Sequence, residues 1–161
     1  MPHLKKLERS TTARIMNLNE DFKEFLQFLN SNDVRYLVIG GYAVAAHGHV
    51  RYTKDIDVWI EQTEANSERL MRALGEFGFG SIGLSSSDFL EPDTVVQLGY
   101  PPRRIDLLTS PSGVTFESCY ENRMTVEVSG TPIPFISLED LKVNKAASGR
   151  PRDLADIEDL S

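Results

Sequence analysis

The chain has very little cysteine and no long apolar run. Cys119 is its only cysteine, so no intramolecular disulfide can form, and a reducing cytoplasm is the expected location. No apolar stretch approaches the roughly 20 residues that a membrane helix needs. The first six residues are basic but lack the apolar run of a signal peptide. We therefore expect a cytoplasmic protein without a membrane role, in which Cys119 is a packed side chain rather than a nucleophile.

The chain also lacks an excess of positive charge. It carries 17 Lys and Arg against 24 Asp and Glu, a net charge of −7. Broad electrostatic binding to nucleic acid requires clustered Lys and Arg, and is therefore not expected. Basic residues do gather locally at 103–104, 142–145 and 150–152. Such a small patch could hold a nucleotide tail or an RNA end.

Hydrophobic periodicity predicts an α+β domain with a mixed sheet flanked by helices. Helices are expected at residues 19–30, 42–48, 63–77, 138–148 and 151–160. Strands are expected at residues 34–39, 55–61, 94–98, 103–109, 124–128 and 133–136. The segment 78–93 is interpreted as a loop that could act as a lid. We expect an N-terminal arm at residues 1–17 and a single domain at 18–161.

The most informative pattern is a glycine pair followed by two closely spaced carboxylates. Gly40 and Gly41 follow an apolar strand, and glycines at a helix start let backbone N–H groups approach a phosphate. Asp55 and Asp57 are two residues apart in a strand, so both project to one side. Paired carboxylates repel each other unless a cation or a proton lies between them. This arrangement indicates a site for a metal-bound nucleotide.

These residues resemble the glycine-pair and Asp-x-Asp motif of the DNA polymerase beta-like nucleotidyltransferase superfamily. The chain is most similar to its small bacterial and archaeal members, near the AbiEii-type toxins and the lincosamide or aminoglycoside nucleotidyltransferases. Members carry a third carboxylate on a later strand, for which Asp106 is the candidate. Many also have a late Lys followed by Arg-Asp-Leu-x-Asp, which Lys145 and residues 152–156 match.

The resemblance implies a minimal catalytic core that transfers a nucleoside monophosphate from an NTP to a hydroxyl. Asp55, Asp57 and Asp106 would be the catalytic carboxylates and would bind Mg²⁺ or Mn²⁺. The nucleotide would be held by Gly40, Gly41, Arg51, Lys145 and Asp153. The acceptor stays open among a small molecule, a tRNA and a protein.

Each candidate also has a purely structural interpretation. The aspartates could be exposed strand residues, and the glycines could form a tight turn. Lys145 could occupy an ordinary position of an amphipathic helix, and Asp153 could cap the last helix. Trp59 could form a wall of the site or pack in the core, and Tyr42 could stack on a base or pack in the core. His47 and His49 lack a third ligand, so we expect surface or capping roles rather than a zinc site.

A non-catalytic function is the alternative. The fold could serve as a nucleotide-binding or interaction module, such as one half of a toxin–antitoxin pair. The large helical acceptor-binding domain of many relatives is not expected, because only about 25 residues follow Ile136. We therefore expect the acceptor site to be shared with a second copy in a homodimer or with a partner protein.

Overall fold

The computed structural model describes residues 18–49, 53–80, 83–100 and 103–160. The predicted arm at residues 1–17 and Arg51 lie outside these residues. Helices span Glu20–Ser31 (α2), Gly40–Ala46 (α3), Glu64–Phe77 (α4), Phe116–Glu121 (α5), Leu138–Ser148 (α6) and Pro151–Leu160 (α7), with a short 3₁₀-helix at Ser86–Leu90 (η1). Strands span Tyr36–Ile39 (β1), Ile56–Ile60 (β2), Val95–Leu98 (β3), Ile105–Leu108 (β4), Met124–Val128 (β5) and Thr131–Phe135 (β6).

The strands form one mixed sheet in the order β3-β4-β2-β1-β6-β5. Strand β2 runs antiparallel to β1 and parallel to β4, and β1 runs parallel to β6. The two edge strands, β3 and β5, are each antiparallel to their neighbour, as the predicted hairpins require. The predicted α+β fold with a mixed sheet is therefore confirmed.

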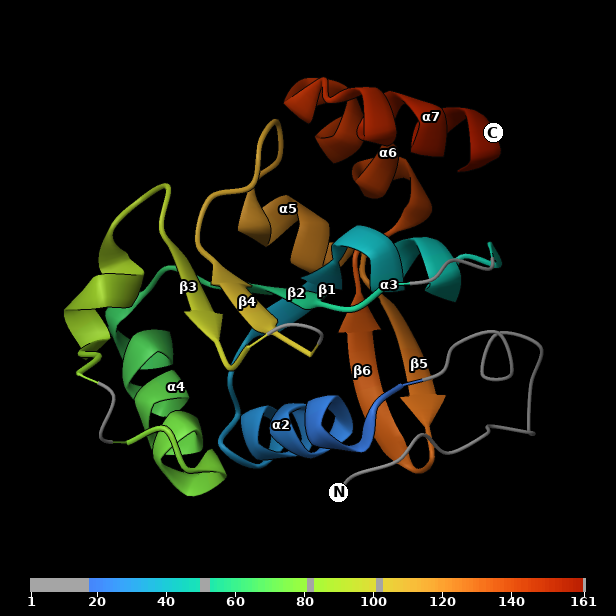
Figure 1. Ribbon diagram of the computed structural model, residues 1–161. Helices are drawn as coiled ribbons and strands as arrows, with labels where there is room; N and C mark the ends of the chain where they lie inside the picture. The colour runs from blue at the N-terminus through green and yellow to red at the C-terminus, as the bar shows by residue number, and fades with distance from the viewer. Residues whose placement is uncertain (1–17, 50–52, 81–82, 101–102, 161) are drawn as a thin grey trace.

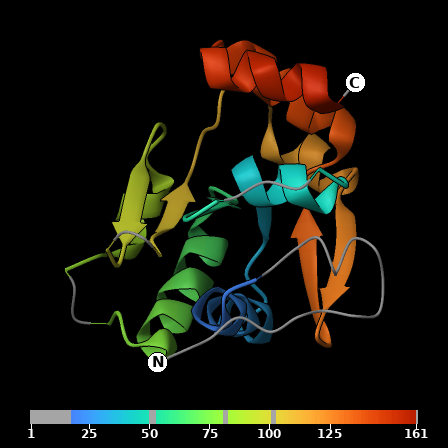
Figure 2. The same ribbon diagram turned by 45° about the vertical axis from the view of Figure 1, so that its right-hand side comes forward.

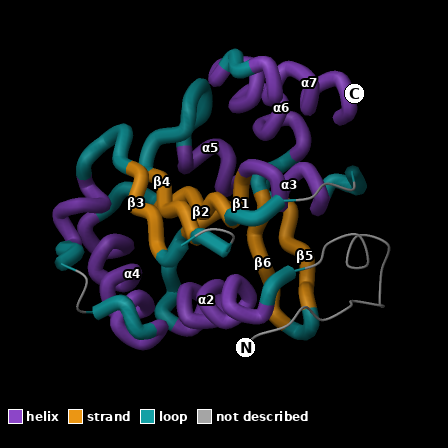
Figure 3. Tube along the Cα trace, in the orientation of Figure 1, coloured by secondary structure: helices purple, strands orange, loops and turns teal. Residues whose placement is uncertain are grey.

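Helices cover both faces of the sheet. Helices α2 and α4 lie on one face, and α3, α5, α6 and α7 lie on the other (Figures 1 and 2). The tube drawing shows the same layers, with the purple helices on either side of the orange strands (Figure 3). The two faces of β2 thus meet different helices, and its side chains divide accordingly.

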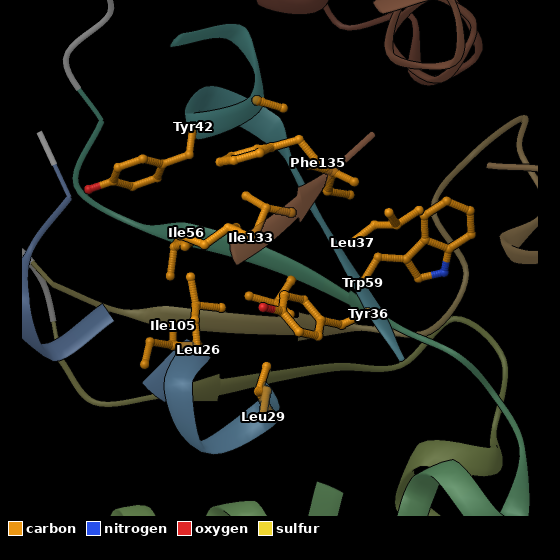
Figure 4. Packing of buried hydrophobic residues seen from close by; sticks show 14 of the residues in the cluster. Leu26, Leu29, Tyr36, Leu37, Tyr42, Ile56, Trp59, Ile105, Ile133 and Phe135 are labelled. Carbon is orange, nitrogen blue, oxygen red and sulfur yellow. The ribbon is translucent and has the colours of Figure 1, made fainter. Parts of the chain in front are cut away.

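The main core lies between the sheet and α2. Asn19 caps α2 by accepting hydrogen bonds from the backbone N–H groups of Asp21 and Phe22 at 2.7 and 3.4 Å. This start directs Leu26 and Leu29 toward the strands, where both are fully buried (Figure 4). Each buried side chain of this size contributes roughly 1.5–3 kcal/mol, so α2 is anchored by its apolar stripe.

Three segments differ from the sequence-based expectation. The predicted loop at 78–93 contains η1, whose Phe89 is fully buried, so this part is packed rather than an open lid. Helix α5 was not predicted, and its Cys119 is buried as a packed side chain, as expected. Strand β6 begins two residues before the predicted start, at Thr131. Among the described residues, no helix combines the length and apolar character needed to cross a bilayer.

Candidate active site

The strand register brings the three predicted carboxylates together. Asp57 lies opposite Asp106 in the parallel β2–β4 pair and opposite Ile39 in the antiparallel β1–β2 pair. Asp55 precedes β2, and its Oδ1 accepts a hydrogen bond from the backbone N–H of Arg104 at 3.3 Å. All three aspartates therefore line one pocket beside the end of β1.

The glycine pair lies against this carboxylate cluster because no side chain would fit there. Gly40 has φ +70°, in the left-handed region, and a Cβ on it would lie 2.2 Å from Oδ2 of Asp57. A Cβ on Gly41 would lie 2.9 Å from Oγ1 of Thr53. Bare backbone at the first turn of α3 therefore faces the pocket, and first-turn N–H groups have no acceptor within their own helix.

Arg104 is the cation that balances the carboxylates. Its Nε and Nη2 donate to the two oxygens of Asp106 at 2.7 and 3.0 Å. Nη2 also lies 3.2 Å from Oδ2 of Asp55. A guanidinium fork that bonds a carboxylate through two nitrogens is among the stronger ion pairs. The pKa of Arg104 is raised by these contacts, so the group stays charged.

The donor set suits a hard cation, although Arg104 now engages part of it. No group of three or more His, Cys, Asp or Glu is arranged to hold a metal ion within the described part of the chain. Mg²⁺ often uses only one or two carboxylates and completes its shell with phosphate oxygens and water. Asp55 and Asp57 supply such a pair, and the backbone of Gly40 and Gly41 lines the pocket beside them.

Asp57 shows the strongest electrostatic perturbation of the cluster. Burial, followed by repulsion from Asp106 and Asp55, raises its pKa to about 6. Arg104 and Arg150 act in the opposite direction but do not cancel this effect. An aspartate whose ionised form is disfavoured gains from a nearby cation. The cluster thus remains short of positive charge even with Arg104 in place.

The opposite wall of the pocket is formed by α6 and α7. Nζ of Lys145 lies 3.2 Å from Oδ1 of Asp153 and 2.8 Å from Oδ2 of Asp156. Nε of Arg150 donates to the other Asp153 oxygen at 2.7 Å, and the Ser148 hydroxyl donates to it as well. Burial raises the pKa of Asp153, but hydrogen bonds from Ser148, Arg150 and Lys145 outweigh it and lower this pKa to about 2.

The pocket between these walls has a volume of about 840 Å³, at the upper end of the range for small-molecule sites. Its charged lining residues are Lys54, Asp55, Asp57, Arg104, Asp106, Lys145, Arg150, Arg152 and Asp153. The carboxylates come mainly from the β2–β4 side, whereas Lys145, Arg150 and Arg152 come from α6, the turn after it and the first turn of α7. A pocket acidic on one side and basic on the other matches a metal-bound phosphate chain.

Residues whose roles the sequence left open lie away from the pocket lining. Trp59 is buried, donates its indole N–H to the carbonyl of Thr109 at 3.1 Å, and packs edge-on against Phe116. Tyr42 is buried and packs edge-on against Phe22. Both therefore serve the core rather than the site.

The histidines of the 47–49 segment do not form a metal site among the described residues. The Nε2 atom of His47 lies 2.8 Å from the carbonyl oxygen of Ile136, and His47 ends α3. This contact ties α3 to the segment that follows β6. His49 belongs to no metal-holding group in the described residues.

Arg104 and Arg150 are charged pocket residues to which the sequence assigned no individual role. Arg104 lies two residues before Asp106, so both side chains project to the same side of the chain, and this spacing is the signal that could have identified the pair. Arg150 was recognised only as part of a basic cluster. Its position at the turn between α6 and α7 depends on how the helices pack, which has no local signature.

Comparisons with known proteins identify the family of the chain and proteins of similar fold. Residues 11–161 match the model of a protein family described as nucleotidyltransferases of unknown function (DUF6036). An antigenic nucleotidyltransferase-like protein from Paracoccidioides brasiliensis is similar in structure, with a TM-score of 0.54 and 20% identity over 99% of this chain and 78% of that one. A candidate nucleotidyltransferase from Thermotoga maritima has a TM-score of 0.57 and 18% identity over 85% of this chain and 88% of that one. No curated protein sequence matches significantly.

Proposed function

The chain belongs to this family of nucleotidyltransferases of unknown function, and we propose that it moves a nucleoside monophosphate group from an NTP to a hydroxyl acceptor in a metal-dependent reaction. The observation that carries this proposal is the register of Asp57 opposite Asp106, beside the close approach of Gly40. A surface aspartate would need neither a parallel partner aspartate nor a glycine packed against its carboxylate.

The reaction joins the acceptor oxygen to the α-phosphorus and breaks the bond between the α- and β-phosphates. Pyrophosphate leaves with the electrons of that bond, and the acceptor proton passes to one of the three carboxylates. Asp55 and Asp57, with Asp106 completing the set, would hold Mg²⁺ or Mn²⁺. When bound, the metal would polarise the phosphate oxygens and neutralise charge on the leaving group.

The remaining pocket residues would position the nucleotide. Backbone N–H groups of Gly40 and Gly41 would meet phosphate oxygens, because no side chain intervenes there. Arg150, at the turn before α7, and Arg152, in its first turn, also line the pocket and would attract the phosphate chain. Transfer at phosphorus depends mostly on such positioning and charge neutralisation.

The acceptor is a small molecule, a tRNA or a protein, and we propose that a second copy or a partner protein completes its site. Apolar residues of α2 are buried in the core, whereas Val143 of α6 and Leu154 of α7 are about half exposed. The terminal helices are therefore the better candidates for association. A strict monomer by light scattering that retains full transfer activity would contradict this part of the proposal.

Transfer is tested with each α-labelled NTP, Mg²⁺ and the three acceptor classes, by mass analysis of the protein, added tRNA and small molecules. We expect a labelled product from the wild type and none from Asp57→Asn. Asp159→Asn is the matched control, because Asp159 is an exposed carboxylate of α7 outside the pocket lining. Equal activity in all three proteins would place the reaction at another site.

A non-catalytic nucleotide-binding module, such as one half of a toxin–antitoxin pair, is the second candidate. The observation that favours it is the pairing of Arg104 with Asp55 and Asp106, which neutralises carboxylates without a metal. Under this alternative, NTP would bind without any product forming in the same assay. The buried Cys119 supports a reducing cytoplasmic setting for either function.

A further inference from the structure

Lys145 is poorly placed to bind a phosphate chain. Its side chain is only 7% exposed, and its ammonium group lies between the carboxylates of Asp153 and Asp156. Both carboxylates are themselves buried, at 5% and 10% exposure. A phosphate that took this ammonium would remove one hydrogen-bonded cation from two buried carboxylates, which is costly in a low-dielectric environment. The lysine therefore joins α6 to α7.

Arg150 has the opposite character. Its side chain is 76% exposed, and only Nε is used in its ion pair with Asp153. In the described residues, its terminal nitrogens form no ion pair. Arg150 also lines the same pocket as Asp55, Asp57 and Asp106, so its charge faces the space beside the carboxylate cluster. The fork of a guanidinium matches the geometry of phosphate oxygens.

We propose that Arg150, and not Lys145, is the residue that binds the terminal phosphates of the nucleotide. Asp153 holds Arg150 through Nε, so neither Nη nitrogen is used in this ion pair. Arg152 also lines the pocket, but no carboxylate of the described residues fixes it in the way that Asp153 fixes Arg150. This inference rests on the proposed function and names the group that recognises the triphosphate.

The test measures binding of inorganic tripolyphosphate without metal, by calorimetry at low salt. Tripolyphosphate carries the recognised chemistry but cannot be a nucleotidyl donor, so its binding is independent of transfer. Arg150→Gln removes the proposed contact, and Arg72→Gln is the matched control, because Arg72 is exposed on α4 at the other face of the sheet. A double variant, Lys145→Met with Asp156→Asn, removes one charge of each sign from the buried cluster.

We expect Arg150→Gln to weaken binding about 10- to 100-fold, the range for hydrogen bonds to a charged group. The variant should fold but melt at a lower temperature than the wild type, because Asp153 loses one hydrogen-bond partner. Arg72→Gln and the double variant should bind within about twofold of the wild type, although the double variant should melt at a lower temperature. If the double variant does not fold, Lys145→Arg replaces it and should bind tripolyphosphate within about twofold of the wild type.

Unchanged binding in Arg150→Gln would overturn the inference. So would a loss in a folded Lys145 variant as large as that expected for Arg150→Gln, or a wild type that does not bind tripolyphosphate. The transfer assay is read separately. If the wild type catalyses transfer but Arg150→Gln binds tripolyphosphate normally, only this inference is rejected. If Arg150→Gln loses tripolyphosphate binding but the wild type catalyses no transfer, only the proposed function is rejected.

Discussion

Asp57 carries an electrostatic cost in the folded protein. Its carboxylate is partly removed from water, and it lies beside Asp55 and Asp106, so its pKa rises from 3.8 to about 6. Each unit of such a shift corresponds to about 1.4 kcal/mol between the two protonation states. Near neutral pH the ionised Asp57 thus destabilises the fold until a cation approaches it. This is the pattern of a site that sacrifices stability for function.

The pH dependence of stability tests this cost. The folded pKa lies above the unfolded one, so the favourable contribution of protonated Asp57 is present below about pH 4 and lost as pH rises through about 6. Asp57→Asn has no such loss. We expect the variant to gain on the wild type by on the order of 2 kcal/mol between pH 4 and pH 7 in metal-free urea titrations. A pH-independent difference would contradict the shifted pKa.

Gly40 tests the close approach of backbone to carboxylate. Gly40→Ala should cost about 2–3 kcal/mol, because alanine resists the left-handed region and its Cβ would collide with Asp57. Gly149→Ala is the matched control, because Gly149 has φ +67° and only an atom 4.0 Å away near its missing Cβ. It should cost about 1–2 kcal/mol. If urea unfolding shows the same loss of unfolding free energy in both variants, the Asp57 side chain moves away from the new Cβ at no cost.

At the residue scale, the sequence predicted which carboxylates gather but not what balances them. Apolar and polar residues alternate around Asp57 and around Asp106, and this is a local sequence pattern. The two aspartates lie opposite each other because β2 and β4 are parallel neighbours in the sheet. The partners of Lys145 are on the next helix, at Asp153 and Asp156. Their contact depends on the angle between α6 and α7, which periodicity does not encode.

At the element scale, regular alternation and capping residues fixed most boundaries to within about two residues. Thr63 and Ser137 cap α4 and α6 as expected, with hydrogen bonds of 3.2 and 3.1 Å to backbone N–H groups. Helix α5 is too short, at six residues, to show a clear period. Strand β6 contains Pro132 and Pro134, which argue locally against a strand. Its register with β1 places Phe135, beyond both prolines, opposite Val38.

Phe89 tests whether η1 is a packed element or a mobile lid. It is fully buried although the surrounding sequence is rich in serine and glycine. Phe89→Ala should cost about 3–4 kcal/mol, as expected for a large core side chain, and Glu91→Ala, at an exposed position, less than about 0.5 kcal/mol. Chemical denaturation checks both. A cost below about 1 kcal/mol for Phe89→Ala would favour a lid.

At the scale of the whole molecule, the net charge of −7 conceals a separation of charge within the pocket. Carboxylates at the start of β2 and β4 and cations of the α6–α7 region line the same pocket, which has a volume of about 840 Å³. The two walls come from distant parts of the chain, and the sheet order brings them together (Figure 1). A metal-bound NTP would meet both walls at once, with its metal on the acidic side and its phosphates on the basic side.

Binding of Mn²⁺ in the presence of a non-hydrolysable NTP analogue, followed by electron paramagnetic resonance, tests this arrangement most directly. The wild type and Asp159→Asn should bind Mn²⁺ tightly only when the analogue is present, because phosphate oxygens complete the metal's ligands. Asp57→Asn should lose this binding while remaining folded by circular dichroism. Nucleotide-dependent Mn²⁺ binding that survives unchanged in folded Asp57→Asn would contradict the account.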